Sequence, residues 1–541
     1  MRILLTVSLI FQTLLLPAQK KVFSKYDYLR GALSPLRSCY DVFFYDLNLK
    51  IDINNKKISG YNDISFIATA NFNEMQIDLF ANMVIDSIMM DYQKLKFTRD
   101  SNATFVYMTK AIEVGNKKTL RIYYSGAPKI AEKPPWEGGF VWSKDAKGNP
   151  WVGVACEGIG ASLWWPCKDH LSDEPDSMRM AFTVPAYLQC ISNGTLRSVR
   201  AESLQYSTYE WFTHYPINNY NVTLNIGIYT TLTDSLTRSD KSSLKIDYYI
   251  LEYNRDKALR HFSQVKKILT CYEVLFGRYP FEKDGYALVE TPYWGMEHQS
   301  AIAYGNNYVN NMMGVLDYII VHETGHEWWG NNLSVADHAE MWIHESFTTY
   351  AEALIIECMY GYQNAVAYLV AHRNKIKNDT PMLGPLNVNY VNHESNDIYY
   401  KGAWMLHTLR SVIANDSIWF DLLLNMQLDL KYSIVTTTHI VFYISKKTGT
   451  DYAWFFDYYL KQKNPPTLCY STKKIGADLE ITYKWENTPP DFIMPIDVFI
   501  SPYERIRLYP THQIKKSVLR NVGTQDIKIA TDYFYINVVK K

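Results

Sequence analysis

Several features are missing from this chain of 541 residues, and each absence excludes a class of protein. Lysine plus arginine and aspartate plus glutamate both number 55, so the chain lacks the basic field on which nucleic-acid-binding domains rely. It has no low-complexity run or short repeat, which argues against disorder and against a solenoid. The seven cysteines lack zinc-finger spacing, and no segment after the N-terminus is apolar enough for a membrane span. We therefore expect a globular protein without a nucleic-acid partner and without a stable membrane span.

The N-terminus has the composition of an export signal. Arg2 gives a short positive start, residues 3–17 are mostly apolar, and Ala18 supplies the small residue of a cleavage site. Residues 1–18 are therefore predicted to be a signal peptide of a protein exported to a periplasm or to the outside medium. An uncleaved membrane anchor is the alternative. Export permits disulfides, and because the cysteines number seven, at least one stays unpaired or pairs between chains.

The hydrophobic periodicity changes twice along the chain, which is too long for a single core. Alternating patterns give way to helical patterns near residue 254, and short strands return after Asn464-Pro465-Pro466. The predicted fold class is multidomain α+β, with an all-β domain at 19–230, a mostly helical domain at 231–463 and a small β-sandwich at 464–541. The clearest strand signals are 41–52, 222–229, 479–483, 496–500 and 533–538.

The segment His322-Glu323-Thr324-Gly325-His326 is the most informative part of the chain. Two histidines at i and i+4 on a helix point the same way, so one metal ion can reach both imidazoles. Glu345 follows His326 by nineteen residues, within a second helical pattern at 340–359 that stops at Gly361. Two histidines, one glutamate and an open position for water form a catalytic zinc site rather than a structural one. The alternative, a helix with two unrelated histidines, is disfavoured by the apolar residues that precede the motif.

The residues around this motif resemble the aminopeptidase N family of zinc metallopeptidases, whose members include the leukotriene hydrolase. The resemblance covers nearly the whole chain after the signal. It implies an N-terminal β-domain, a thermolysin-like catalytic domain and a β-sandwich, in agreement with the periodicity. It rests on five segments in the family's order, namely 165–169, 294–298, 322–331, 342–347 and 399–403.

Two residues depart from the family's pattern. Trp294 stands where the family usually has glycine, and His298 where it usually has asparagine. Both changes bear on the substrate-binding edge more than on the chemistry, and His298 is expected either to contact substrate or simply to pack. The helical C-terminal domain of many members is not expected here, so the cleft would be more open or would be covered by a dimer partner.

The resemblance implies a catalytic role for several residues. One Zn²⁺ per chain is held by His322, His326 and Glu345, and it lowers the pKa of a water toward ~7. Glu323 takes the proton of this water as general base and passes it to the leaving amine. Tyr399 donates a hydrogen bond to the oxyanion, with Tyr400 as the alternative donor.

The same resemblance implies how the substrate is bound. Glu297, and Glu157 from the β-domain, are predicted to bind a free α-ammonium through charge-assisted hydrogen bonds. With Glu297 and Glu157 holding the ammonium group, only one residue of the substrate fits between these carboxylates and the zinc ion. Gly295 and Met296 are expected beside the substrate. Met296 would contact the side chain of its first residue, since methionine adapts to varied shapes. Glu340 is either a partner of a ligand histidine or a solvated helix residue.

We therefore predict an exported zinc-dependent aminopeptidase that removes single residues from peptides with a free N-terminus. The alternative from another class is a non-catalytic peptide-binding scaffold, which has no need of three metal ligands, Glu323 and Tyr399 together. An additional epoxide hydrolase activity, as in the related hydrolase, has no specific support in these residues. The sequence is compatible with an oligomer and indicates no particular one.

Overall fold

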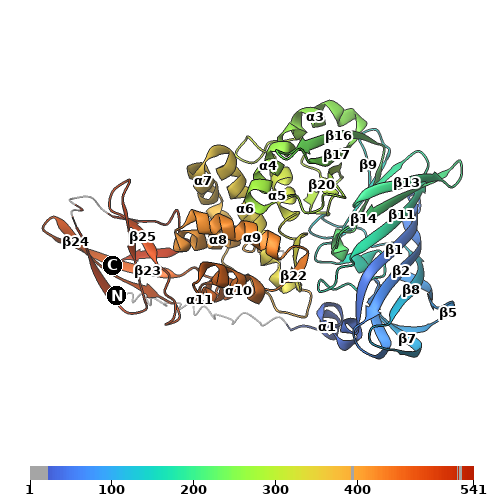
Figure 1. Ribbon diagram of the computed structural model, residues 1–541, viewed down its shortest axis with the longest axis horizontal. Helices are drawn as coiled ribbons and strands as arrows, with labels where there is room; N and C mark the ends of the chain where they lie inside the picture. Colours follow the sequence, from blue (N-terminus) through green and yellow to red (C-terminus); the bar gives the residue numbers. More distant parts are fainter. Residues whose placement is uncertain (1–21, 391–394, 521, 523–526) are drawn as a thin grey trace, which may run out of the picture.

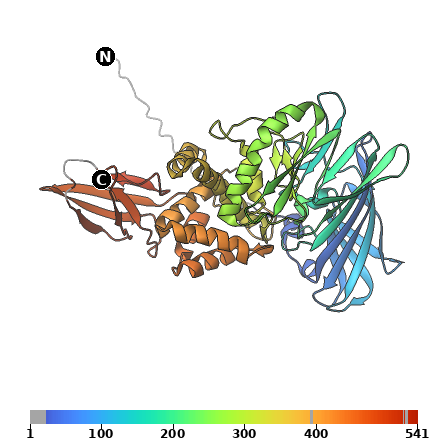
Figure 2. The same cartoon turned by 45° about the horizontal axis from the view of Figure 1, so that its top comes forward.

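The computed structural model describes residues 22–390, 395–520, 522 and 527–541, so the predicted signal peptide at 1–18 lies outside it. A β-rich N-terminal region, a helical middle and two C-terminal sheets follow one another along the longest axis (Figure 1). The turned view in Figure 2 shows the same succession. This arrangement confirms the predicted fold class. Among the described residues, no helix is both long and apolar enough to cross a membrane.

Alternation of apolar and polar residues builds the N-terminal region, because every second side chain of a strand faces the core. In β1 (Tyr40–Asp52), which matches the predicted strand at 41–52, Tyr45, Leu47 and Leu49 are buried. β1 lies inside a sheet of β13 (Thr195–Ala201), β14 (Tyr206–Thr213), β11 (Ser177–Pro185), β1, β2 (Lys57–Ala68), β8 (Lys117–Gly126), β4 (Met83–Met90) and β5 (Gln93–Lys94).

Two smaller sheets and two short helices complete this region. One sheet contains β3 (Phe72–Asp78), β7 (Ala103–Ile112) and β6 (Lys96–Asp100), and the other contains β12 (Gln189–Ser192), β15 (Leu224–Gly227), β10 (Pro150–Ala155) and β9 (Gly139–Lys144). The helices are α1 (Lys25–Gly31) and α2 (Pro35–Ser38).

A five-stranded sheet, which the periodicity did not predict, joins the β-rich region to the helices. The predicted strand at 222–229 was wrong as a single element, because the chain passes there from β15 into the first strand of this next sheet. The new sheet contains, in spatial order, β16 (Tyr229–Thr237), β17 (Ser243–Leu251), β18 (Tyr286–Glu290), β20 (Ile302–Tyr304) and β19 (Gly295–Met296). The two-residue strand β19 is therefore an edge strand, antiparallel to β20.

Three helices of the middle region hold the metal motif in place. In α5 (Tyr318–His326), the Asp317 side chain caps the first turn by accepting hydrogen bonds from the Ile319 and Ile320 amides. The next helix, α6 (Trp342–Tyr360), ends at Gly361 with φ 91°, as predicted. Against it lies α8 (Tyr400–Ile413), so close that a Cβ on Gly402 would stand 1.7 Å from the Ser346 Oγ. Only glycine permits this approach, which brings the start of α8 beside the first turns of α6.

The other helices surround these three and are α3 (Arg255–His261), α4 (Val265–Phe276), α7 (Tyr362–His372), α9 (Asp416–Asp429), α10 (Thr437–Thr448) and α11 (Ala453–Lys461). A short parallel pair, β21 (Leu333–Val335) and β22 (Ser433–Val435), links the segment after α5 to the segment after α9. The helical pattern predicted between residues 254 and 460 is thus present, interrupted by β18 to β20 and by the short strands β21 and β22.

The C-terminal residues form two sheets. The first contains β27 (Lys515–Leu519), β24 (Asp478–Glu486), β23 (Thr467–Ile475) and β29 (Asn537–Lys540), and the second β26 (Arg505–Leu508), β25 (Ile496–Phe499) and β28 (Lys528–Ile529). The predicted strand at 533–538 was wrong for most of its length, because the backbone there forms a turn. The amides of Tyr533 and Phe534 bond the Ala530 carbonyl, and Arg373 binds the carbonyl oxygens of Thr531 and Ile536.

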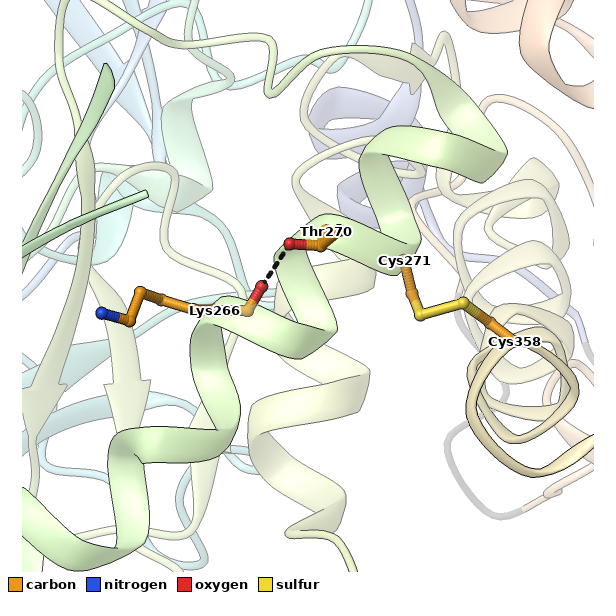
Figure 3. The surroundings of a disulfide bond; sticks show 4 residues. All are labelled: Lys266, Thr270, Cys271 and Cys358. Atoms are coloured by element: carbon orange, nitrogen blue, oxygen red, sulfur yellow. Dashed lines mark hydrogen bonds between the residues drawn. A yellow bond between two sulfur atoms is a disulfide. The ribbon is translucent and has the colours of Figure 1, made fainter. Parts of the chain in front are cut away.

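A disulfide joins α4 to α6 through Cys271 and Cys358 (Figure 3). The loop that it closes spans 87 positions and contains the whole His322-to-Glu345 motif. The other five cysteines are free and buried, so Cys156 and Cys167 pack rather than bridge. The sequence alone could not choose among the pairings, because the two partners lie on helices far apart in the chain.

Removing this disulfide is expected to destabilise the helical region. The double variant Cys271→Ser/Cys358→Ser should lose about 2–4 kcal/mol of unfolding free energy, because the unfolded chain is no longer constrained over so long a loop. Denaturant unfolding followed by the helical circular dichroism signal measures the loss, with Cys469→Ser, a buried free cysteine, as the control. An unchanged unfolding midpoint, with or without reductant, would contradict the bridge.

Candidate active site

The structure brings His322, His326 and Glu345 together at the contact between α5 and α6. The two Nε2 atoms lie 3.2 Å apart, and the Glu345 Oε2 lies 3.6 Å from each of them. All three side chains are buried. Ligand atoms about 2.0–2.2 Å from one tetrahedral zinc ion stand about 3.3–3.5 Å apart, so the triangle has the size that zinc requires.

The hydrogen bonds behind these ligands fix which atoms face the centre. His322 Nδ1 lies 2.7 Å from the Glu352 Oε1, and His326 Nδ1 lies 2.9 Å from the Trp329 carbonyl oxygen. Both Nδ1 atoms therefore donate, and both Nε2 lone pairs point inward. The Glu345 Oε2 is buried without a hydrogen-bond partner in the described part of the chain. Two facing lone pairs and a bare carboxylate oxygen need a cation between them, so the residues fit a zinc ion.

Glu323 lies beside this centre without belonging to the triangle. A Cβ built on Gly295 would stand 2.7 Å from the Glu323 Oε1, so a side chain at this position of β19 would displace the carboxylate. Burial, together with the neighbouring Glu297 and Glu345 carboxylates, raises the pKa of Glu323 well above its usual range. A carboxyl group with a raised pKa holds a proton more readily, as a group that accepts a proton and passes it on must.

Further carboxylates converge on the same point from other parts of the chain. Glu297 follows β19, is buried, and offers an oxygen to the same small cluster as Glu323 and His326. Glu157 follows β10 and is half-buried. Burial and repulsion from Glu297, Glu345 and Glu323 raise the pKa of Glu157 well above its usual range. Four carboxyl groups around one cleft form a site that binds positive charge.

The two tyrosines at the start of α8, Tyr399 and Tyr400, have different neighbours. The ring of Tyr399 lies 6.3 Å from the His322 ring, between centroids. The ring of Tyr400 instead stacks on His372 at 5.8 Å, and its hydroxyl accepts a hydrogen bond from the Lys375 Nζ. Burial raises the pKa of Tyr399 well above its usual range, so its hydroxyl keeps the proton that a donor needs. The geometry favours Tyr399 over Tyr400 as a donor toward the centre.

One cleft of about 340 Å³ is lined by all nine residues that the sequence predicted for the site. Gly295 and Met296 form one side of it through β19. Of the two departures from the family's pattern, Trp294 lines the cleft, whereas His298 is fully buried outside it. The buried position of His298 favours packing over substrate contact.

Two residues of the site escaped the sequence analysis. Glu352 orients His322 and lies two helical turns after Glu345, a spacing that places both on one face of α6 and could have revealed it. Tyr220 donates from its hydroxyl to the Glu297 Oε1 at 2.9 Å, across 77 positions of sequence, and no local pattern announces it. Glu340 has neither of its expected roles, because it is buried and accepts a hydrogen bond from the Thr437 amide.

Comparison with known families and proteins is consistent with this site. Residues 260–459 match the Peptidase family M1 domain. Leucine aminopeptidase 2 of Vanderwaltozyma polyspora is 23% identical over 338 residues, which cover 58% of this chain and 47% of the relative. Aminopeptidase B of Rattus norvegicus is 23% identical over 270 residues, covering 45% and 41%. The chain spans about half the length of the curated relatives that it matches.

Solved structures show the same fold. A two-domain M1 zinc metallopeptidase mutant bound to L-tryptophan superimposes with a TM-score of 0.67 at 20% identity, covering 79% of this chain and 95% of the other. The M1 zinc metallopeptidase of Deinococcus radiodurans gives a TM-score of 0.65 at 20% identity, covering 79% and 94%. At this identity the likeness establishes the fold alone.

The contact between Glu352 and His322 leads to a prediction about metal affinity. Replacing Glu352 with Gln removes the charge behind the ligand and should weaken zinc binding about 10–100-fold. Competition with a chromophoric chelator measures the affinity. Glu340→Gln is the matched control, since that glutamate is also buried near α6 but touches no ligand. Equal zinc affinity in the two variants would contradict the orienting role of Glu352.

Proposed function

We propose that this chain, whose residues 260–459 match the Peptidase family M1 domain, is a zinc-dependent aminopeptidase that removes single residues from the N-termini of peptides. The observation that supports this most directly is the carboxylate cluster. Glu345 completes the metal triangle, while Glu297 and Glu157 line the cleft beside it with no ion pair to a lysine or arginine in the described residues. Their negative charge suits the free α-ammonium of a peptide.

The proposed chemistry divides between the metal and the chain. His322, His326 and Glu345 would hold the zinc ion, which when bound would supply a Lewis acid to make a water more acidic and to stabilise negative charge on the attacked carbonyl oxygen. Glu323, beside the triangle, accepts the proton of the attacking water. It then transfers that proton to the nitrogen of the leaving amine, which its raised pKa favours.

The tyrosine hydroxyl acts on the other side of the reacting carbonyl. Tyr399 retains its proton and donates a hydrogen bond where negative charge develops on oxygen. The close packing of Gly402 on Ser346 holds the start of α8 against α6. Tyr399 and the ligand Glu345 are therefore fixed relative to each other before substrate binds.

Amine recognition limits cleavage to the first peptide bond. The Glu297, Glu323 and His326 ligand atoms all lie within 4.8 Å of one another. An ammonium held by Glu297 therefore stands within about one residue's length of the metal centre, since an extended residue spans about 3.3 Å. A peptide with a blocked N-terminus would leave buried carboxylates without their cation.

Export remains part of the proposal. The N-terminal composition supports it, and so does the disulfide between Cys271 and Cys358, since disulfides persist in oxidising compartments.

The defining experiment compares a short peptide that has a free N-terminus with its N-acetylated twin, with and without a zinc chelator. We expect the free peptide alone to release its first residue, and chelation to stop the release. Glu323→Gln should retain one zinc per chain and lose about 10²–10⁴-fold in turnover. Cleavage of both peptides would exclude amine recognition, and full activity of the variant would exclude Glu323 as the base.

The hydrogen bond from Tyr220 to Glu297 leads to a separate prediction. Tyr220→Phe should raise KM about tenfold for peptides with a free N-terminus and change kcat little, because a hydrogen bond to the amine-binding carboxylate is lost. Steady-state kinetics separates the two constants. Tyr40→Phe, which loses a buried hydroxyl bonded to the Gln76 carbonyl, is the matched control. An unchanged KM would show that Glu297 needs no support from the β-rich region.

A further inference from the structure

Aromatic side chains form one wall of the cleft, and the outer ones have no role in the proposed reaction. The Trp294 ring stacks on the Tyr318 ring at 5.5 Å and 18°, and the Tyr318 ring stacks on His322 at 5.2 Å and 20°. The Trp136 ring lies 5.9 Å from the Trp294 ring, between centroids, and is tilted by 45° to it. A row of four rings therefore leads from the mouth of the cleft to a metal ligand.

The outer part of this wall is exposed to an unusual degree for such side chains. Trp136 is 54% exposed, Trp294 is 38% exposed, and the neighbouring Met313 is 48% exposed. All three line the cleft. Large apolar side chains that gather at a cleft without covering one another mark a binding surface for an apolar group.

The edge strand shows which part of a peptide would meet this wall. Along the chain, Glu297 lies at the amine site, Gly295 passes the general base Glu323, and Trp294 comes next. A peptide extended along this edge has its amine at Glu297 and its scissile bond near Glu323. Trp294 then lies beyond the scissile bond, on the side of the leaving amine.

The positions of the metal ligands independently indicate the same direction for a bound peptide. Glu297 shares its cluster with His326, and the aromatic row ends on His322. The amine site and the wall therefore flank different ligands of one centre. A substrate that spans the centre has its first residue on the His326 side and its second residue on the His322 side.

We propose that Trp294 and Trp136 form the subsite for the side chain of the second residue, and that they select large apolar side chains, aromatic ones first. This inference rests on the proposed aminopeptidase activity and names its substrate class. Trp294 is fixed for the task, because its indole N–H donates to the Asn306 Oδ1 at 3.0 Å and orients the ring. A glycine at this position would leave the cleft without the wall.

The test uses the full chain with zinc and three dipeptide amides: Ala-Phe, Ala-Ala and Phe-Ala. We expect kcat/KM for Ala-Phe to exceed that for Ala-Ala by about tenfold or more. Trp294→Ala and Trp136→Ala should each lower this ratio severalfold. The ratio of Phe-Ala to Ala-Ala, which reports on the first residue, should stay constant. Ratios cancel any general loss of activity.

Controls separate the subsite from folding and from the proposed function. Trp294→Phe keeps an aromatic face without the indole N–H and should retain most of the preference, whereas Tyr503→Ala, which is 99% exposed elsewhere, should leave both ratios unchanged. A constant Ala-Phe ratio in both tryptophan variants, or a change only in the Phe-Ala ratio, would overturn the inference. No cleavage of any of the three amides by the unaltered protein would instead refute the proposed function.

Discussion

The two imidazole nitrogens 3.2 Å apart, with their lone pairs facing each other, are the constraint on which the middle of the molecule depends. Their Nδ1 atoms are committed to Glu352 and to the Trp329 carbonyl, so neither ring can turn its N–H inward to relieve the contact. Only a cation between the rings satisfies them. A bound metal ion would therefore stabilise the contact between α5 and α6 as well as take part in the proposed reaction.

Three remote parts of the chain supply what the motif itself lacks. The disulfide ties the end of α6 to α4, so the loop that holds the ligands is closed covalently. Gly402 lets α8 press against α6 and sets the position of Tyr399. From the β-rich region, Tyr220 reaches across to Glu297. Cys271 and Ala403 belong to the core of the helical region, whereas Tyr220 belongs to the core of the β-rich region. The site is therefore positioned by both cores rather than by one helix pair.

The sequence predicted what depends on local spacing and missed what depends on long-range contact. His322 and His326 stand at the helical spacing of four residues, Glu345 lies in the next predicted helix, and the structure brings all three together. Gly361 ends α6 as predicted, because a glycine tolerates the positive φ at that position. The short strand β19 has only two residues and no alternation to detect, so it was overlooked. Tyr533 and its neighbours have strand-like composition, yet the bonds of Arg373 and Ala530 hold them in a turn.

The edge strand β19 unites the two substrate-facing features of the cleft. Trp294 precedes the two residues of β19 and Glu297 follows them, so the strand sets the distance between the two side chains. A side chain at Gly295 would displace the general base, because its Cβ would stand 2.7 Å from the Glu323 Oε1. The Trp294 indole contacts Asn306, Tyr318 and Trp136, so a substitution there should leave the amine site and the base in place. The strand therefore separates the residues that fix where a peptide is cut from the residue that distinguishes one peptide from another.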